Sequence, residues 1–543
     1  MPTVKDVSFE VLRRFGLTTL FANPGSTEVS LLAGLPSDLD FVLGLHEASV
    51  IGIATGYALR TGRPALALLH TTAGLGNAVG ALATARVNRA SLVVVVGQQD
   101  RRHLAAEPFL AGRLHGLAGE YPVWQHQPER PQDVPAALAR AWHEARDARG
   151  PAIVVVPMAD WDAEADLDAP FTAPATLHRG RGVDDAALAE VAALLEGSTA
   201  PVVVAGAGND SPAGWAALTG LAERLDCPVW QEAFGARAGF PQDHRLFAGH
   251  LPAARSGLRK ALAAHDVVLT VGAPAFRQYP YESGAFVESG TRLAVITDDP
   301  AEAHRSPADV AVVADPAEAV ALLTRRLPAA SGPAREALRR PRPSRPGPGD
   351  PLRAVHVLDA LAERLPHDAV LLEETPSSRP DLHALVPARA PLGFLSAAMG
   401  GLGFALPAAI GVRLAGPDRP VVAVLGDGAS LYSIQALWSA WHYRVGALFV
   451  VLANGRYAIM DRLSEQAGAA VPAWPPFTEV SVTTLARGFG CPAERVEDHP
   501  NLLATLDTVL PTLAGRREPL LLEVAVEPGD HYRARTHHGK GYR

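Results

Sequence analysis

The chain has 543 residues, of which 48% are apolar and 20% are charged, a composition typical of globular proteins with a large buried core. Its formal charge of −8 argues against a nucleic-acid-binding protein, which needs a basic face. The N-terminus lacks the features of a signal peptide, and no run of about 18 apolar residues is present to cross a membrane. The two cysteines, Cys227 and Cys491, are far apart in the sequence. They predict neither a disulfide framework nor a metal site, so we expect a reducing, cytoplasmic location.

Short apolar runs alternate along the chain with longer alanine- and leucine-rich stretches of helical spacing. This alternation predicts an α/β protein of doubly wound, mostly parallel sheets, in which the short runs are strands. The expected strands are Ala65–Leu69, Leu92–Val96, Ile153–Val156, Val202–Ala205, Val267–Val271, Leu293–Ile296, Val370–Leu372, Val421–Leu425, Phe449–Leu452 and Leu520–Val526.

Changes in composition divide this chain, which is too long for a single core. Residues 331–351 are rich in proline and arginine and contain almost no aliphatic side chains, which predicts an extended, exposed linker. A softer change lies near residues 170–181. The predicted organisation, in chain order, is an α/β domain at 1–175, a middle α/β domain at 182–328, the linker at 331–351, a third α/β domain at 352–528 and a polar tail at 529–543.

The strongest local signal is Gly426-Asp427-Gly428, directly after the apolar run Val421–Leu425. A second apolar run ends just before Asn454-Gly455. Two buried strands therefore deliver a carboxylate and an amide oxygen, and Mg²⁺ accepts such oxygen ligands together with those of a phosphate. The glycines beside Asp427 let backbone N–H groups approach a phosphate closely. The pattern predicts a diphosphate held through a metal ion at the carboxyl ends of parallel strands.

Four further motifs accompany this turn: Asn23-Pro24-Gly25-Ser26, Leu45-His46-Glu47-Ala48, the segment Leu69-His70-Thr71-Thr72-Ala73-Gly74-Leu75-Gly76-Asn77, and Gly400-Gly401-Leu402-Gly403-Phe404-Ala405-Leu406-Pro407. With these motifs the chain resembles the thiamine-diphosphate-dependent 2-oxo acid decarboxylase family, and within it the benzoylformate decarboxylases. The resemblance runs in order from Val7 to Val526.

The resemblance implies an arrangement of domains around the cofactor. The first domain is the pyrimidine-binding domain, and the third binds the diphosphate and Mg²⁺. The middle domain of such decarboxylases usually binds no nucleotide. Because thiamine diphosphate lies between the first domain of one subunit and the third domain of its neighbour, a homodimer is the minimum assembly and a tetramer is usual. The expected partners are a small 2-oxo acid and further copies of the chain, with no nucleic acid and no membrane.

Family positions also assign the cofactor contacts. Glu47 corresponds to the carboxylate that faces N1′ of the aminopyrimidine, although an exposed helix residue is the alternative. Leu402 corresponds to the apolar side chain that supports the bent cofactor, while the metal ligands are Asp427, Asn454 and the backbone carbonyl of Arg456. The chain departs from the family at Ala453, where relatives have an asparagine. The remaining expected cofactor contacts are Asn23, Pro24, Gly400, Gly426, Gly428, Ala429, Ser430 and Tyr457.

Two first-domain residues are expected to handle the substrate, although each also has a structural interpretation. Ser26 corresponds to the serine that binds the substrate carboxylate, but serine after Pro24-Gly25 also suits a turn cap. His70 corresponds to a catalytic histidine, and imidazole is the side chain best suited to move protons near neutral pH. The alternative for His70 is a structural histidine that follows a buried strand.

The second catalytic histidine of the benzoylformate decarboxylases has no counterpart, because Tyr279 occupies its position. Phenols have a reference pKa of about 10, which makes tyrosine a poor proton shuttle at neutral pH. The other candidate proton donors are His115, His250 and the tail pair His537-His538. We expect each of these histidines to be solvated.

The expected substrate pocket is apolar but loses aromatic faces. Ser396 and Leu463 stand where the relatives have phenylalanines, Ile459 and Met460 lie nearby, and Pro376 replaces a threonine. Apolar burial still suits an aryl group, and a branched or aliphatic acyl group fits equally well.

The predicted function is therefore the non-oxidative decarboxylation of an apolar 2-oxo acid, aryl or branched, such as benzoylformate, to an aldehyde and CO₂. The thiazolium of the cofactor would act as the electron sink. The alternative in the same cofactor class is a carboligase or lyase of 2-hydroxy ketones, which the tyrosine at position 279 favours. Further alternatives are a homologue without activity, opposed by Glu47, Asp427 and Asn454, and a flavin-dependent acetolactate synthase, opposed by the middle domain.

Overall fold

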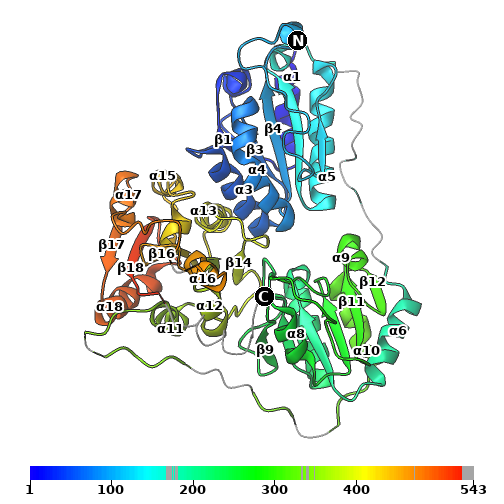
Figure 1. The fold of residues 1–543 in the computed structure, drawn as a ribbon. Helices are drawn as coiled ribbons and strands as arrows, with labels where there is room; N and C mark the ends of the chain where they lie inside the picture. The colour runs from blue at the N-terminus through cyan, green and yellow to red at the C-terminus, as the bar shows by residue number, and fades with distance from the viewer. Residues whose placement is uncertain are drawn as a thin grey trace. The chain divides into compact units, whose positions relative to one another are not determined.

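The computed structural model describes residues 1–166, 174, 177, 182–331, 334–337, 342–347, 349–469 and 471–528. Within these residues the chain forms three six-stranded α/β sheets, one after another along the sequence (Figure 1). The described part of 331–351 carries no helix or strand and is mostly exposed. Among the described residues, no helix is both long enough and apolar enough to cross a membrane. The polar tail, including His537 and His538, lies outside the described residues.

The first sheet has the strand order β2-β1-β3-β4-β6-β5, with parallel neighbours. Its strands are β1 (Thr19–Asn23), β2 (Asp40–Leu43), β3 (Ala65–Leu69), β4 (Leu92–Gln98), β5 (Trp124–His126) and β6 (Pro151–Pro157). Its helices are α1 (Val4–Arg14), the 3₁₀ helix η1 (Ser26–Glu28), α2 (Val29–Leu32), α3 (Glu47–Thr61), α4 (Thr71–Val87), η2 (Arg101–Ala106), η3 (Pro131–Asp133), α5 (Val134–Ala148) and η4 (Asp160–Asp162).

Both faces of the first sheet are covered, by α1 and α5 on one side and by α3 and α4 on the other (Figure 1). On β3, alternate residues Leu66 and Leu68 belong to the hydrophobic cluster that also contains α1 and α5 side chains. Ala67 and Leu69 are just as buried but lie outside that cluster. Because successive side chains of a strand point to opposite faces, covering both faces requires a continuous apolar run.

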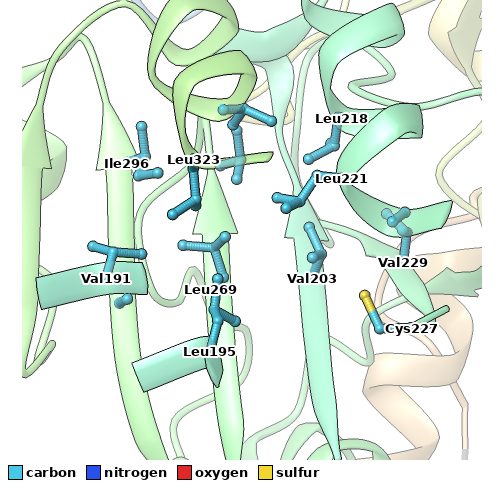
Figure 2. Packing of buried hydrophobic residues seen from close by; sticks show 14 of the residues in the cluster. Val191, Leu195, Val203, Leu218, Leu221, Cys227, Val229, Leu269, Ile296 and Leu323 are labelled. Atoms are coloured by element: carbon cyan, nitrogen blue, oxygen red, sulfur yellow. The ribbon is translucent and has the colours of Figure 1, made fainter. Parts of the chain in front are cut away.

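The middle sheet has the order β12-β11-β10-β7-β8-β9 and is also parallel. Its core joins strand residues such as Val203, Leu269 and Ile296 to leucines of the covering helices (Figure 2). Its strands are β7 (Pro201–Ala205), β8 (Val229–Gln231), β9 (Phe247–His250), β10 (Val267–Val271), β11 (Arg292–Thr297) and β12 (Val310–Val313), and its helices are α6 (Asp185–Glu196), η5 (Ala207–Asn209), α7 (Pro212–Leu225), α8 (Arg255–Leu262), α9 (Pro300–His304) and α10 (Pro316–Arg326).

The third sheet has the order β14-β13-β15-β16-β18-β17. Its strands are β13 (Val370–Glu374), β14 (Phe394–Ser396), β15 (Val421–Gly426), β16 (Leu448–Ala453), β17 (Ala493–Val496) and β18 (Leu520–Ala525). Its helices are α11 (Ala354–Arg364), α12 (Arg379–Leu385), α13 (Ala405–Ala415), α14 (Asp427–Ser430), α15 (Ala436–His442), α16 (Ala458–Gln466), α17 (Val482–Gly488), α18 (His499–Val509) and η6 (Leu510–Thr512). The predicted α/β fold class is confirmed, and every strand expected from an apolar run is present.

Helices α3 and α13 approach each other closely because glycines line their contact. A Cβ atom on Gly411 of α13 would lie 1.8 Å from the carbonyl oxygen of Ile53, and one on Gly56 of α3 would lie 2.0 Å from that of Ala408. Real Cβ atoms do not approach backbone oxygens so closely, so both positions require glycine on grounds of space. This contact packs α3, the helix that begins at Glu47, against α13, the helix that follows the loop containing Leu402.

We expect Gly411→Ala to lower the melting temperature of the protein, because overpacking a tight contact costs about 1–3 kcal/mol. Gly220→Ala is the matched control, since Gly220 also lies inside a helix but an added methyl group there would have no atom within 4 Å. That substitution removes a helix-glycine penalty of about 1 kcal/mol. Thermal unfolding of both variants measures the difference, and equal melting temperatures would contradict the close contact.

Candidate active site

Asp427 and Asn454 lie together at the carboxyl ends of two neighbouring strands. Strands β15 and β16 pair in parallel, and Asp427 follows the first while Asn454 follows the second. The Oδ2 atom of Asp427 accepts hydrogen bonds from the backbone N–H groups of Asn454 (2.8 Å) and Gly455 (2.6 Å), and its Oδ1 atom accepts one from Gly428 (2.8 Å). The residue begins the single helical turn α14 instead of lying in an open turn.

The chemistry of this site fits a divalent cation. Asp427 is buried, and its burial raises the pKa of its carboxyl group, with the nearby negative charge of Glu523 adding to the effect. The side-chain oxygen of Asn454 accepts from the backbone N–H of Arg456 at 3.1 Å, so the backbone at position 456 lies against the same site. A carboxylate, an amide oxygen and a backbone carbonyl are the kind of oxygen donors that Mg²⁺ binds.

The other predicted diphosphate contacts surround this pair. A Cβ atom on Gly428 would lie 2.6 Å from the ring of Tyr457, so that glycine packs directly on the tyrosine. Ser430 is buried and donates its hydroxyl hydrogen to the carbonyl oxygen of Asp427 at 2.7 Å. Ala429 is buried in the same turn. The side chain of Arg456 points to Asp461, with Nε 2.6 Å from Oδ2.

Glu47 is held by two amide side chains. It is the first residue of α3 and is only 8% exposed. Its Oε1 accepts a hydrogen bond from Nδ2 of Asn23 (3.1 Å), and its Oε2 accepts one from Nδ2 of Asn77 (3.0 Å). The alternative of a solvent-exposed helix residue is therefore excluded. Asn77 was not among the predicted site residues, although it belongs to one of the motifs that carry the resemblance.

Ser26 and His70 follow the neighbouring strands β1 and β3. Ser26 begins η1 after the exposed Pro24 and is itself exposed. His70 precedes α4, its side chain is 17% exposed, and its Nδ1 atom lies 3.0 Å from Oε2 of Glu28. The next residue, Thr71, has a φ of 32°, a left-handed conformation that costs a β-branched residue about 1–3 kcal/mol. Such strain is concentrated at functional sites.

The loop that carries Leu402 is fixed by a buried carboxylate that was not predicted. Glu374, at the end of β13, accepts backbone hydrogen bonds from Gly403 (2.6 Å), Phe404 (2.8 Å) and Ala405 (2.7 Å). Gly400 has a φ of 72°, which favours glycine at that turn. Leu402 itself is 36% exposed at the tip of the loop, so it is a surface side chain and not part of the core.

The expected pocket residues fall on different elements. Ile459, Met460 and Leu463 lie on α16, where spacings of three and four residues place them on one side of the helix. Met460 is 42% exposed, and the backbone N–H of Ile459 donates to the hydroxyl of Ser377 at 2.9 Å. Ser396, on β14, is buried and its hydroxyl accepts a hydrogen bond from Arg379 at 3.3 Å.

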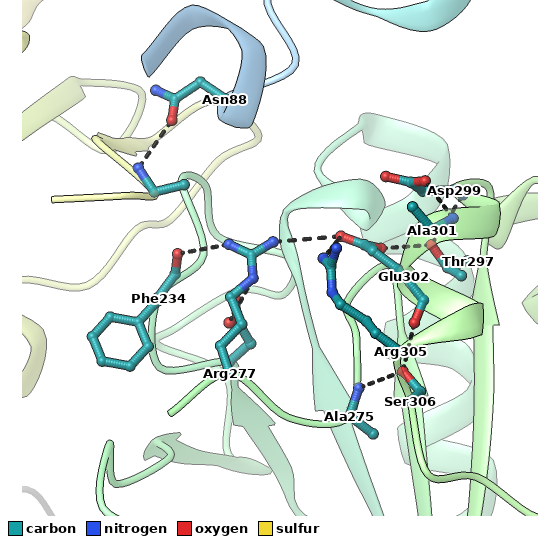
Figure 3. Close-up of polar contacts among 12 residues, drawn as sticks. Asn88, Phe234, Ala275, Arg277, Thr297, Asp299, Ala301, Glu302, Arg305 and Ser306 are labelled. Carbon is teal, nitrogen blue, oxygen red and sulfur yellow. Dashed lines mark hydrogen bonds and ion pairs between the residues drawn. The ribbon is translucent and has the colours of Figure 1, made fainter. Parts of the chain in front are cut away.

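Tyr279 is 60% exposed. Two residues before it in the sequence, Arg277 joins a network of polar contacts with Phe234 and Glu302 (Figure 3). The guanidinium of Arg277 donates to the carbonyl oxygen of Phe234 at 3.3 Å and lies 3.5 Å from a carboxylate oxygen of Glu302 and 3.6 Å from one of Glu232. Both glutamates are buried, and burial raises the pKa of Glu232 while the positive charge of Arg277 opposes that effect. This network fixes the side chain of Arg277 and leaves the tyrosine side chain accessible.

The other candidate proton donors, His115 and His250, differ in their surroundings. His115 is exposed, as expected. His250 is not a solvated histidine, so that prediction is wrong: it is half-buried, and its ring stacks on that of His383 with centroids 3.8 Å apart. Burial lowers the pKa of His383 to about 3. No local pattern indicates this stack, because the two histidines are far apart along the chain.

Comparison with known protein families identifies the class. Residues 2–122 match the N-terminal TPP binding domain of thiamine pyrophosphate enzymes, residues 188–323 their central domain, and residues 377–524 their C-terminal TPP binding domain. The Glu47 site falls in the first of these segments, and the Asp427–Asn454 site falls in the last. The chain belongs to the family of thiamine pyrophosphate enzymes, whose cofactor is also called thiamine diphosphate.

Within that family the chain is similar to benzoylformate decarboxylases. It is 37% identical over 538 residues to benzoylformate decarboxylase from Pseudomonas aeruginosa, covering 97% of this chain and 99% of that protein. The solved structure of a thiamine diphosphate-dependent 4-hydroxybenzoylformate decarboxylase from Rhodococcus jostii superposes with a TM-score of 0.92 at 34% identity, over 97% of this chain and all of that one. Benzoylformate decarboxylase from Polynucleobacter necessarius also gives a TM-score of 0.92, at 32% identity over 97% of this chain and 99% of that one.

The buried Glu374 makes the stability of the protein depend on pH. Burial raises the pKa of this carboxyl group to about 7 from an ordinary value of 4.5, although the three backbone donors lower it. The folded protein therefore retains a proton that the unfolded chain loses between these values, so the contribution of Glu374 to stability falls as the pH rises through that window. The stability of the wild type relative to Glu374→Gln should therefore be highest near pH 5 and lowest near pH 8.

Melting temperatures of both proteins across this pH range measure that difference. If the melting temperature of the wild type instead rises relative to that of Glu374→Gln with increasing pH, the three N–H donors outweigh burial and keep Glu374 ionised.

Proposed function

We propose that the protein decarboxylates an aryl 2-oxo acid such as benzoylformate to the corresponding aldehyde and CO₂, using thiamine diphosphate and Mg²⁺. The observation that carries this proposal is the pair of preformed carboxylate sites. One is Glu47, held by Asn23 and Asn77, and the other is Asp427, paired with Asn454. The similarity to benzoylformate and 4-hydroxybenzoylformate decarboxylases along nearly the whole chain supports the aryl substrate.

Each group of residues has a defined part in this proposal. The bound cofactor would supply the electron sink that loss of CO₂ from a 2-oxo acid requires. Glu47 would hold the aminopyrimidine ring through its carboxylate, and Leu402 would support the cofactor from the loop fixed by Glu374. Asp427, Asn454 and the carbonyl of Arg456 would bind Mg²⁺, which would hold the diphosphate. Ser26 and His70 would orient the substrate and exchange protons with it.

The substrate specificity that we propose is broad in shape but apolar. Ile459, Met460 and Leu463 offer aliphatic surface, and about 25 cal/mol per Å² of buried apolar area is gained whether or not the partner is a ring. Ser396 is bonded to Arg379, which introduces a polar contact where relatives have an aromatic side chain. Aryl and branched 2-oxo acids both remain candidates on this basis.

We further propose that the active enzyme is a homo-oligomer, at least a dimer and in the family pattern a tetramer. In that arrangement Glu47 of one subunit and Asp427 of its neighbour would bind the same cofactor. Large exposed apolar side chains in the first and third domains, including Phe109 (85% exposed), Tyr432 (55%) and Val29 (57%), are consistent with subunit contacts.

A carboligase is the second candidate function, and Tyr279 is the residue that favours it. With a phenol in place of the second histidine, this chain would deliver a proton to the decarboxylated substrate more slowly, and a second carbonyl compound could react in place of the proton. Tyr279 is 60% exposed, so its phenol group is accessible to solvent.

The middle domain supports the decarboxylase over a flavin-dependent synthase. In open α/β sheets, ligand phosphates bind at the turn after a central strand. Here the N–H groups of that turn, from Gly206 and Gly208, donate to the carbonyl oxygens of Val271 (2.9 Å) and Gly272 (2.8 Å). A Cβ atom on Gly206 would lie 2.3 Å from that of Ala273. The turn therefore packs against the end of the neighbouring strand, and these two N–H groups already have backbone acceptors.

Glu47→Gln and Asp427→Asn should separate catalysis from cofactor binding. We expect Glu47→Gln to lose more than 99% of turnover with every 2-oxo acid while still binding thiamine diphosphate with Mg²⁺, because its amide keeps the shape of the carboxylate but not its charge. Asp427→Asn should lose binding itself, since it removes the charged metal ligand. Fluorescence titration and steady-state rates measure the two effects, and unchanged turnover in Glu47→Gln would overturn the assignment.

Product analysis distinguishes the two candidate functions. Incubation with benzoylformate alone should yield benzaldehyde and CO₂, and added acetaldehyde should yield at most a minor 2-hydroxy ketone. Accumulation of the ketone with no free aldehyde under either condition would instead establish a carboligase. A panel of aryl, indolyl and branched 2-oxo acids, compared by kcat/KM, would then define the preferred acyl group.

A further inference from the structure

Three adjacent strands bring Glu28 and Thr27 to the ring of His70, with Gly97 against the far side of the Glu28 carboxylate. In the first sheet β3 lies between β1 and β4, and Leu69 of β3 pairs with Asn23 on one side and Val96 on the other. The residues just beyond these pairs therefore meet at one edge of the sheet. Glu28 belongs to η1 after β1, His70 follows β3, and Gly97 continues β4.

Short hydrogen bonds join the side chains of His70, Glu28 and Thr27. Nδ1 of His70 lies 3.0 Å from Oε2 of Glu28 and 2.9 Å from Oγ1 of Thr27. The hydroxyl of Thr27 donates to Oε1 of Glu28, and the backbone N–H of Gly25 donates to Oε2 at 2.7 Å. The Glu28 side chain is 1% exposed, so its carboxylate is removed from solvent.

Two glycines make room for this arrangement. A Cβ atom on Gly97 would lie 1.7 Å from Oε1 of Glu28, and one on Gly25 would lie 2.4 Å from Cγ and Nδ1 of the His70 ring. Neither glycine has a positive φ, so both are required by space and not by backbone conformation. The backbone is built closely around one position of the carboxylate and one position of the imidazole ring.

The hydrogen-bond network assigns the proton on His70. The Thr27 hydroxyl hydrogen is directed to Glu28, so the atoms facing Nδ1 are a carboxylate oxygen and a hydroxyl oxygen, and both can accept. Nδ1 must therefore carry a hydrogen and donate it. In the neutral ring Nε2 is then the nitrogen with the free lone pair, which is the form that can take a proton from a substrate and return it.

We propose that Glu28 is the positioning residue for His70, fixing the ring and the Nδ1–H tautomer so that Nε2 serves as the proton-transfer atom. This inference rests on the proposed function, because it concerns the histidine assigned to that reaction. Outer partners that orient a histidine in this way typically contribute 10- to 100-fold when they hold a metal ligand, and we expect a similar scale here. Glu28 touches neither substrate nor cofactor in this proposal.

Two substitutions separate the geometric effect of Glu28 from its charge. Glu28→Gln keeps the shape, and the N–H of Gly25 orients the amide so that its oxygen, not its NH₂ group, faces Nδ1. An acceptor for the Nδ1–H group is then retained but the negative charge is lost, and kcat/KM for benzoylformate should fall about tenfold. Glu28→Ala removes both the hydrogen-bond acceptor and the negative charge, and kcat/KM should fall about 100-fold. Glu10→Gln, an exposed glutamate of α1 in the same domain, is the matched control and should leave kcat/KM unchanged.

A double-mutant cycle with His70→Ala provides the decisive measurement. If Glu28 acts through His70, each Glu28 substitution should change kcat/KM less than twofold in the His70→Ala background. If Glu28 only stabilises the Gly25–Glu28 turn, each Glu28 substitution should lower kcat/KM by the same factor in the wild-type and the His70→Ala backgrounds. That result would overturn the proposal. Should Glu28→Ala fail to fold, the Glu28→Gln cycle alone carries the test.

Failure of the proposed role of Glu28 can be distinguished from failure of the proposed function. A wild-type enzyme that converts no 2-oxo acid would refute the decarboxylase assignment. An active wild type with equal costs in the two backgrounds would refute only the role of Glu28.

Discussion

Parallel pairing of buried strands is the constraint on which the candidate site depends. In a parallel sheet every carboxyl end lies at the same edge, so the residues that follow neighbouring strands must meet there. In the third sheet this brings Asp427 beside Asn454. In the first sheet it brings Glu28 beside His70. The apolar runs that build the core therefore also place the polar groups that would do the chemistry.

Buried carboxylates recur at these strand ends, and each is matched to a different set of donors. Glu47 accepts from two amide side chains, Glu374 from three backbone N–H groups, and Asp427 from three others. Glu28 alone among them faces an imidazole. Because a buried charge is costly unless it is hydrogen-bonded or paired, these contacts fix loop positions. They also leave Asp427 suited to a cation and Glu28 suited to orienting a base.

Much of the fold could be predicted because the central strands are buried on both faces. Runs such as Ala65–Leu69 and Val421–Leu425 are fully apolar and appear as strands. The strands that escaped prediction include edge strands such as β5 and β17, which are short and partly exposed, so no apolar run marks them. The turn Gly426-Asp427-Gly428 was equally visible, since a carboxylate and glycines after an apolar run form a local pattern.

By itself, the sequence determined the α/β class, the thiamine diphosphate family and the motif residues Glu47, Asp427 and Asn454. Each of these rests on local periodicity or on short contiguous motifs. Only the tertiary structure decided the partners of those residues: Asn77 on Glu47, Glu374 under the Leu402 loop, Glu28 on His70, and the His250 stack. These contacts join segments that are separate along the chain, and strand order and backbone approach, which no local pattern encodes, bring them together.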